Sequence, residues 1–174
     1  MSTTIGSNQM TGDLTPLTVG DPQLIAHPVA QELLQATIPA HLGYVAPDGA
    51  PRVVPLLFHW TGSEVVVTSW PDDPKVAAIQ ATPTVSVTID TSAFPFRVLS
   101  LRGEATVTIV DGVAPECLPT FSRYFGPDEG RGWVERMRMM SDQQARIAIR
   151  PDWVNVVDFQ TRFPSGMTKR MRQV

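Results

Sequence analysis

Residues 65–90 read VVVTSWPDDPKVAAIQATPTVSVTID and decide the fold. The apolar run at 65–69 predicts a buried strand, and Asp73 followed by Pro74 predicts a helix start. Pro83 predicts the end of this two-turn helix, which we place at 74–81. The alternation at 84–90 is typical of a half-buried strand. This stretch therefore predicts a strand, a short helix and a second strand.

Further strands flank this stretch on both sides. Strand formers fill residues 40–69 and are divided by turn signals at 46–51 and 61–64, which predicts a meander of three strands. Extended runs are also expected at 97–110, 145–150 and 153–159, the last two separated by Pro151. Six or seven antiparallel strands with a few short helices predict a mainly β chain that forms a closed or nearly closed barrel, because closure removes exposed edges.

Three short helical patterns and two tails complete the chain. We expect a helix after Asp21 that is interrupted near Pro28, an amphipathic segment at 114–126 that Pro119 splits in two, and a helix around Trp133. The following boundaries are predicted: a flexible N-terminal tail at 1–20, one domain at 21–163 and a C-terminal tail at 164–174.

Composition excludes several classes of function. The 174 residues carry a formal net charge of −3, which argues against a nucleic-acid partner. The single cysteine excludes an intrachain disulfide and a thiolate-rich metal site. No run approaches the ~18 apolar residues that span a bilayer, so we expect no membrane partner and a soluble, cytoplasmic protein.

Motifs for hydrolase, P-loop, Rossmann and zincin chemistry are absent from the sequence. The three histidines, His27, His41 and His59, fall in separate segments without helical pairing, so no metal site is predicted. Asp73 is interpreted as a helix cap and Asp72 as a solvated loop residue.

Lys75 stands in the first turn of the expected helix, where the helix dipole disfavours a cation. A lysine is useful there if a phosphate binds between the helix start and the hydroxyls of Thr68 and Ser69. The alternative is a surface lysine lying over the barrel. Spacing alone leaves both interpretations open.

From about residue 34 to 163 the order of elements resembles the pyridoxamine 5′-phosphate oxidase-like family of flavin-binding split β-barrels. Four stretches carry the resemblance: YVAPDGAPRVVPLLFHW (44–60), the stretch at 65–90, LRGEATV (101–107) and WVNVVDF (153–159). The resemblance implies a split barrel whose helix start holds the cofactor phosphate and whose second strand contacts the ring system. The implied cofactor-binding residues are Val54, Pro55, Leu56, Leu57, Thr68, Ser69, Pro74 and Lys75.

The resemblance also implies a function. It implies an oxidoreductase that binds FMN and transfers hydride to or from a small organic substrate, a reaction that needs no catalytic acid or base from the chain. True pyridoxamine phosphate oxidases carry an Arg and a Lys on the second strand and an Arg before the helix lysine, where this chain has apolar residues around 53–58 and Pro74. A true vitamin B6 oxidase is therefore not expected. In lacking these cations the chain also resembles the branch of the family that uses the 8-hydroxy-5-deazaflavin (F420-type) coenzyme. One sequence does not separate that branch from the members that use FMN.

Family members are usually homodimers with active sites between subunits, and a dimer would cover Phe94, Phe96, Trp133 and Met137. Residues from the 91–97 loop, the Trp133 region or the Arg162 region of the second subunit would then complete the pocket. Two alternatives stay open: a non-catalytic flavin or haem binder, with His41 or His59 as the axial ligand, and an empty structural barrel.

Overall fold

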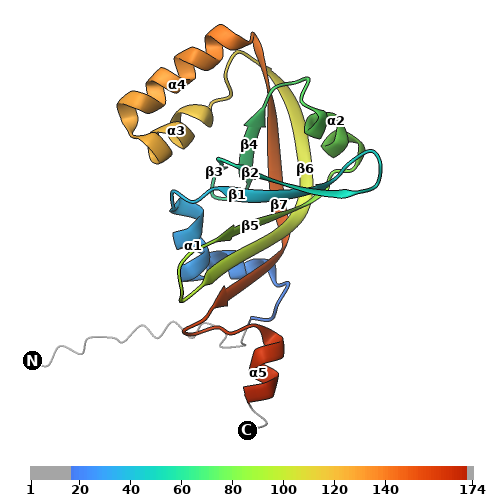
Figure 1. Ribbon diagram of the computed structural model, residues 1–174, viewed down its shortest axis with the longest axis vertical. Coiled ribbons are helices and arrows are strands. Elements are labelled where there is room, and N and C mark those ends of the chain that lie inside the picture. Colours follow the sequence, from blue (N-terminus) through green and yellow to red (C-terminus); the bar gives the residue numbers. More distant parts are fainter. Residues whose placement is uncertain (1–16, 172–174) are drawn as a thin grey trace, which may run out of the picture.

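The computed structural model describes residues 17–171 and contains one seven-stranded antiparallel sheet (Figure 1). The strand order is β2-β1-β5-β6-β7-β4-β3. The strands are β1 (Ala40–Val45), β2 (Pro51–Leu56), β3 (His59–Trp60), β4 (Val65–Ser69), β5 (Thr84–Asp90), β6 (Arg97–Asp111) and β7 (Gln143–Asp158). The helices are η1 (Pro22–Ala26), α1 (Pro28–Gln35), α2 (Pro74–Ala81), α3 (Cys117–Phe125), α4 (Pro127–Met140) and α5 (Ser165–Met171).

The sheet curls into a split barrel because its two edge strands are neighbours in the chain. Only Leu57 and Phe58 separate β2 from β3, although these strands are the opposite edges of the sheet. Phe58 is fully buried in the core at this junction. The interior is filled by aliphatic side chains from both halves of the sheet, among them Leu42, Val67, Val87, Ile89, Leu99, Leu101, Ile147, Ile149 and Val154.

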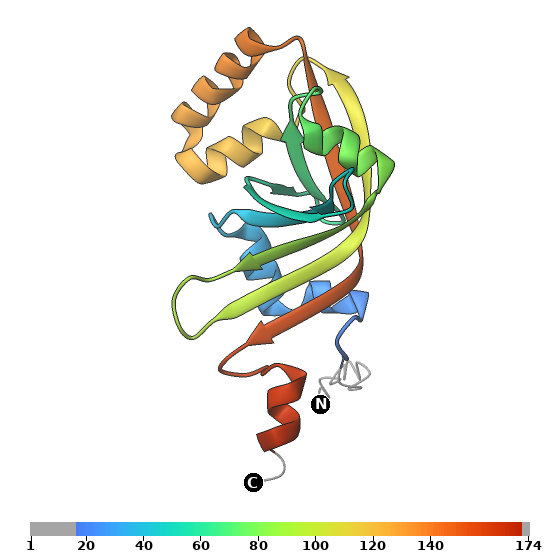
Figure 2. The same ribbon diagram turned by 45° about the vertical axis from the view of Figure 1, so that its right-hand side comes forward.

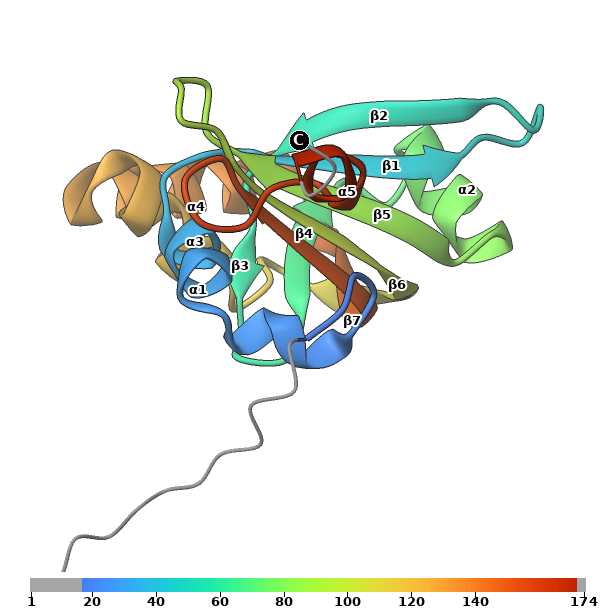
Figure 3. The same ribbon diagram turned by 90° about the horizontal axis from the view of Figure 1, so that it is seen from below.

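Helices cover the barrel at separate places. Figure 2 shows the orange α3 and α4 together near one end of the strands and the red α5 near the other end. Figure 3 shows α2 beside the hairpin of β1 and β2, in agreement with its contacts to β1 and β6. The predicted helix at 74–81 and the predicted strand at 84–90 are confirmed with these bounds. The predicted break near Pro28 is confirmed as the boundary between η1 and α1.

The prediction of two strands separated by Pro151 is wrong. β7 runs continuously from Gln143 to Asp158, and a register shift at Arg102/Gly103 places Pro151 opposite Gly103. Asp152 is the extra residue of this bulge, since Arg102 pairs with Trp153. A proline is tolerated at a bulge because the ladder needs no N–H there.

Two other expectations need correction. The meander at 40–69 contains four strands, because the run at 51–60 divides into β2, which pairs with β1, and β3, which pairs with β4. The segment at 114–126 contains one unbroken helix, α3. Pro119 lies in the first turn of α3, where no N–H has an intrahelical partner, so it breaks nothing.

The predicted tails are shorter than expected where the structure describes them. Leu17 packs against the core, and the Gly20 N–H donates to the Val154 carbonyl at 2.9 Å. The rest of the expected N-terminal tail, 1–16, lies outside the described residues. The segment at 164–174 contains the helix α5, which the sequence did not announce because none of its side chains is buried. Within residues 17–171 no helix is long and apolar enough to cross a membrane.

Candidate functional site

The turn between β4 and α2 is built from a short polar segment. Asp73 caps α2, with its side chain accepting from the Lys75 N–H, and Pro74 occupies the first helical position. The Asp73 N–H donates to the Trp70 carbonyl at 3.1 Å and closes the turn. This geometry brings the end of β4, at Ser69, against the start of α2.

Three donors converge on the Asp73 carboxylate. The Ser69 hydroxyl donates to Oδ2 at 3.0 Å, the Lys75 backbone N–H donates to Oδ1 at 3.1 Å, and the Lys75 ammonium pairs with Oδ2. Burial alone would raise the pKa of Asp73, but the hydrogen bonds from Lys75 and Ser69 lower it overall. The cation is tolerated at a helix start because this carboxylate offsets its charge.

The Lys75 side chain is only 12% exposed, so it is not a solvated surface lysine. An ammonium has three N–H donors, and the single ion pair with Asp73 leaves donors for a second anion. The helix start therefore holds a Lys75–Asp73 ion pair with N–H donors of Lys75 left over, and such donors at a helix start suit a phosphate.

Thr68 does not join this site. Successive strand residues point to opposite faces, and Thr68 Oγ1 lies 3.6 Å from the Cys117 sulfur under α3. Together with Leu56 and Leu57, Thr68 lines a small recess beneath α3 and α4. The predicted phosphate residues are thus divided, with Ser69, Pro74 and Lys75 on one side of β4 and Thr68 on the other.

Within residues 17–171, strand β2 pairs only with β1, which leaves its other edge open in this part of the chain. Pro51 and Pro55 lack an N–H and therefore occupy the positions whose backbone points away from β1. By alternation, Val53 is the one residue of β2 that offers an N–H at this edge, and its side chain is 66% exposed. Val54 and Leu56 turn their backbone toward β1, and their side chains pack against the core. A ring bound along β2 would meet carbonyl groups and the Val53 N–H.

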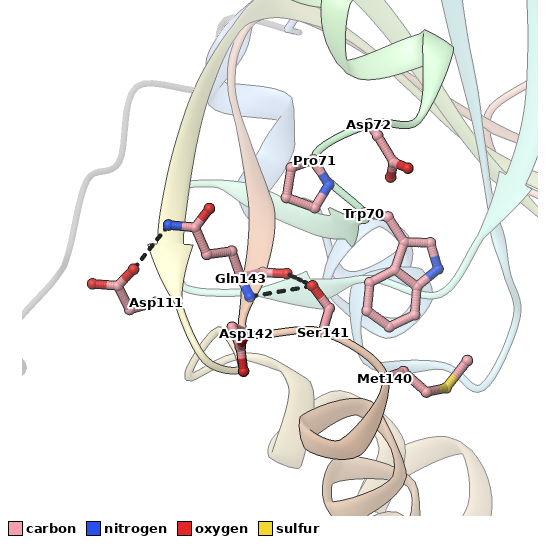
Figure 4. A pocket seen from close by; sticks show the side chains of 8 residues that line it. All are labelled: Trp70, Pro71, Asp72, Asp111, Met140, Ser141, Asp142 and Gln143. Atoms are coloured by element: carbon pink, nitrogen blue, oxygen red, sulfur yellow. Dashed lines mark hydrogen bonds between the residues drawn. The ribbon is translucent and has the colours of Figure 1, made fainter.

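An open cleft of about 1070 Å³ adjoins the helix start (Figure 4). Trp70, Pro71 and Met140 give it an apolar side, and Figure 4 shows the Trp70 indole and Met140 near one another. The carboxylates of Asp72, Asp111 and Asp142 also line the cleft. Asp111 accepts a hydrogen bond from Gln143 Nε2. An aromatic wall with several carboxylates suits an uncharged ring better than an anion.

Helices α3 and α4 are fixed to the barrel by Arg123. Its guanidinium donates to the Leu34 carbonyl at 2.8 Å and to the Phe58 carbonyl, and it stacks on the Phe58 ring at 4.5 Å. Tyr124 adds a hydrogen bond to the Ile38 carbonyl at 2.8 Å. These contacts hold the two helices over the recess that Thr68 lines.

Glu116 and Arg146 form a second polar cluster beside that recess. Arg146 Nε donates to Glu116 Oε1 at 2.9 Å, and Arg146 Nη2 lies 3.6 Å from Glu64. Burial alone would raise the pKa of Glu116, but the Arg146 hydrogen bond and charge lower it overall. No sequence motif marked this cluster, because its members come from three distant segments.

The lowered pKa of Glu116 predicts acid sensitivity. Glu116 adds stability above its ordinary pKa of 4.5, and this stability is lost as the pH falls through the lower folded-state pKa. In urea unfolding at stepped pH values from about 7 to about 3, we expect Glu116→Gln to reduce the loss of stability below about pH 4.5. If Glu116→Gln loses as much unfolding free energy on acidification as the wild type, Glu116 is not a source of the acid sensitivity.

Among residues 17–171 there is no group of three or more His, Cys, Asp or Glu side chains that could hold a metal ion. His41 is half-exposed, and its Nδ1 lies 3.7 Å from Asp90. His59 is partly buried, and burial, followed by the nearby Arg123 charge, lowers its pKa below 6.5. His59 is therefore neutral at pH 7.

No family model and no curated protein matches the sequence. Solved structures do match the fold. An F420 reductase has 28% sequence identity and a TM-score of 0.57, with 72% of this chain and 94% of that chain covered. A candidate pyridoxamine 5′-phosphate oxidase from Listeria innocua has 17% identity and a TM-score of 0.53, with 73% and 94% covered. A haem storage protein from Vibrio cholerae has 15% identity and a TM-score of 0.56, with 76% and 93% covered.

The chain has the split-barrel fold of the pyridoxamine 5′-phosphate oxidase-like proteins. The resemblance drawn from the sequence and the predicted fold class are both confirmed. The likeness extends over about three quarters of the chain, and the matching structures are named as an F420 reductase, a candidate pyridoxamine 5′-phosphate oxidase and a haem storage protein.

Proposed function

We propose that this split barrel is an oxidoreductase that binds FMN, or the F420-type deazaflavin coenzyme, with the phosphate at Ser69 and Lys75. The observation that carries the proposal is the convergence of the Ser69 hydroxyl, the Lys75 N–H and the Lys75 ammonium on the Asp73 carboxylate, which shows that the start of α2 gathers donors for an anionic oxygen. Their position next to an aromatic cleft supports it. The likeness to an F420 reductase also supports it.

The residues present fit such a coenzyme in a defined way. The remaining N–H donors of the Lys75 ammonium suit a phosphate, the Ser69 hydroxyl can join them only by turning from Asp73, and the Trp70 wall suits a ring. When bound, the coenzyme supplies the hydride chemistry. The chain's part is to bind and orient: Lys75 fixes the charged end, β2 offers its backbone edge to the ring, and Trp70 with Met140 shields one face from water.

Titration of the purified protein with FMN, the deazaflavin coenzyme and haemin, followed by absorbance and fluorescence, tests this proposal. We expect saturable binding of at least one of the two flavin-type coenzymes. The oxidised and reduced forms of that coenzyme should differ in dissociation constant. Binding of haemin alone would contradict it.

A haem-binding role is the second candidate, and one observation favours it. His59 is partly buried and neutral, so its imidazole nitrogen has a lone pair available for iron. His41 is the weaker candidate, because it is more exposed and lies next to Asp90. A Soret shift that appears with haemin and is lost in His59→Ala would support this role.

We also propose that the molecule is a homodimer. Phe94 is 72% exposed and packs edge-to-face with Phe96 and Phe159, and Trp133 packs at a tilt against Phe125 near the surface. Exposed aromatic clusters of this kind are typically covered by a partner. Light scattering at micromolar concentration should give about twice the chain mass of 19.1 kDa. A monomer that still binds the coenzyme would exclude a site shared between subunits.

A further inference from the structure

A second cleft, here called the α5 cleft, lies at the far end of β7 from the cleft beside α2. It has a volume of about 960 Å³ and is enclosed by residues 17–19, 155–157 and 161–169. β7 begins at Gln143, which lines the cleft beside α2, and ends at Asp158, close to α5 (Figure 2). None of the cofactor-binding residues predicted from the sequence lines the α5 cleft.

Helix α5 turns one face to this cleft. Ser165, Thr168 and Lys169 line it, and residues three and four positions apart lie on the same face of a helix. No side chain of α5 is buried, so core packing within the described chain does not account for its position beside the end of β7. A molecule bound in the cleft would give this face a partner.

Arg162 brings a positive charge into the wall of the α5 cleft. Its Nε donates to the Val156 carbonyl at 3.0 Å and its Nη2 donates to the Leu17 carbonyl at 2.9 Å, which holds the half-buried guanidinium in place. Both acceptors are neutral, and Arg162 forms no ion pair among residues 17–171. These two bonds leave N–H donors of the guanidinium over, and a partly buried charge without a counter-ion favours an anion beside it.

The other charges near the α5 cleft have the same effect. Lys169 adds a second cation, which is exposed and also has no ion pair in the described part of the chain. No carboxylate lines the cleft. The side chain of Asp158, the acidic residue nearest to Arg162 in the sequence, accepts from the Gln160 N–H and the Thr161 hydroxyl at 2.8 Å each. An anion in the cleft would therefore meet two cations and no lining group of its own charge.

The rest of the wall selects the kind of anion. It is mainly apolar, with contributions from Leu17, Val19, Val157, Phe163 and Pro164. Hydrocarbon gains free energy when it leaves water for such a surface, whereas inorganic phosphate would leave this surface uncovered. A volume near 960 Å³ lies within the range of small-molecule sites. The combination suits an anion that carries a hydrocarbon body.

We propose that the α5 cleft is a binding site for a monocarboxylate with a hydrocarbon body, whose carboxylate lies between Arg162 and Lys169. The apolar wall formed by residues 17–19 and 163–164 holds the hydrocarbon. This site does not depend on the proposed coenzyme function.

Octanoate and octanamide are a matched pair of probes, because they have the same chain and nearly the same size, and only octanoate is charged. Each is titrated into full-length ¹³C-methyl-labelled protein, and the Leu17 and Val157 methyl signals are followed by NMR. We expect octanoate to bind at least tenfold more tightly than octanamide, as for hydrogen bonds to charged groups. Equal affinities, no saturable binding of octanoate, or shifts confined to other methyl groups would overturn the proposal.

Two neighbouring cations of α5 provide a variant and its control. Lys169→Gln removes a charge that lines the cleft, and because this lysine is exposed we expect octanoate to bind only about two- to fivefold more weakly. Arg170→Gln removes an equal charge from the next residue, which does not line the cleft, and it should change the affinity less. Equal effects of the two substitutions would overturn the placement of the carboxylate. Arg162→Gln should weaken octanoate binding about tenfold, and the comparison of the two α5 variants stands even if this variant folds poorly.

A competition experiment separates this site from the coenzyme site. The affinity for octanoate is measured with and without saturating FMN or deazaflavin coenzyme, and we expect it to stay the same. Competition would mean that the cleft is part of a partner subunit's coenzyme site, and it would overturn the proposal. Octanoate binding without any binding of a flavin-type coenzyme contradicts only the proposed function.

Discussion

Lys75→Ala should weaken binding of FMN or the deazaflavin coenzyme ten- to a hundredfold. The substitution removes a mostly buried ammonium from the helix start, and a hydrogen bond between charged groups is worth ~1.5–3 kcal/mol. The Asp73 cap keeps its bonds from Ser69 and from the backbone of residue 75, so the helix stays capped. A fluorescence titration with each coenzyme measures the effect, and thermal unfolding of the cofactor-free protein should change little.

Two controls accompany this variant. Riboflavin has the ring of FMN without the phosphate, so its affinity should hardly respond to Lys75→Ala. Arg131→Ala removes an equal charge from an exposed ion pair with Asp128 on α4, and it should leave both ligands unaffected. Equal losses for FMN and riboflavin would mean that Lys75 acts on the ring or on folding.

Substitution of Asp73, the ion-pair partner of Lys75, should have the opposite effect on coenzyme affinity. Asp73→Asn keeps an N-cap side chain but removes the negative charge that shares the donors with a phosphate. Removing one charge at ~4 Å is worth ~1 kcal/mol in water, so FMN should bind about fivefold more tightly. Weaker binding in this variant would instead make Asp73 the residue that positions Lys75.

Gly103→Ala should destabilise the fold by about 3 kcal/mol, an overpacking effect at the upper end of its usual range. A Cβ at this position would lie 2.0 Å from the Arg150 carbonyl oxygen and 2.9 Å from its carbon, and these are backbone atoms of β7. Relief of that clash requires β6 and β7 to separate at the bulge. Urea unfolding measures the change in free energy.

Gly132→Ala is the matched control for this variant. No atom lies within 4 Å of the added methyl, and the position is inside α4, where alanine is favoured over glycine by ~0.5–1 kcal/mol. We expect a small gain in stability. A Gly103→Ala protein as stable as the wild type would show that the two strands do not approach this closely.

The elements that short-range chemistry determines could be predicted from the sequence. Asp73, Pro74 and Pro83 predicted α2 because a cap, a first-turn proline and a helix breaker act within a few residues. The period-two pattern predicted β5 for the same reason. The position of Ser69 and Lys75 beside the start of α2 followed from these elements.

Features that depend on distant pairing could not be predicted in this way. The continuity of β7 through Pro151 depends on Gly103, and the cleft joins Trp70, which follows β4, to Met140, which precedes the neighbouring strand β7. The separation of Thr68 from Ser69 follows from strand alternation, but the face that each occupies is set by the packing of α3. The Glu116–Arg146 cluster likewise forms only when α3 lies against β7.

One affinity ratio tests whether the start of α2 holds the phosphate of a flavin-type coenzyme. Wild-type protein is titrated with FMN and riboflavin, and with the deazaflavin coenzyme and its phosphate-free ring compound, under the same conditions. We expect the phosphate-bearing member of at least one pair to bind ten- to a hundredfold more tightly than its phosphate-free partner. Equal affinities within both pairs would contradict it.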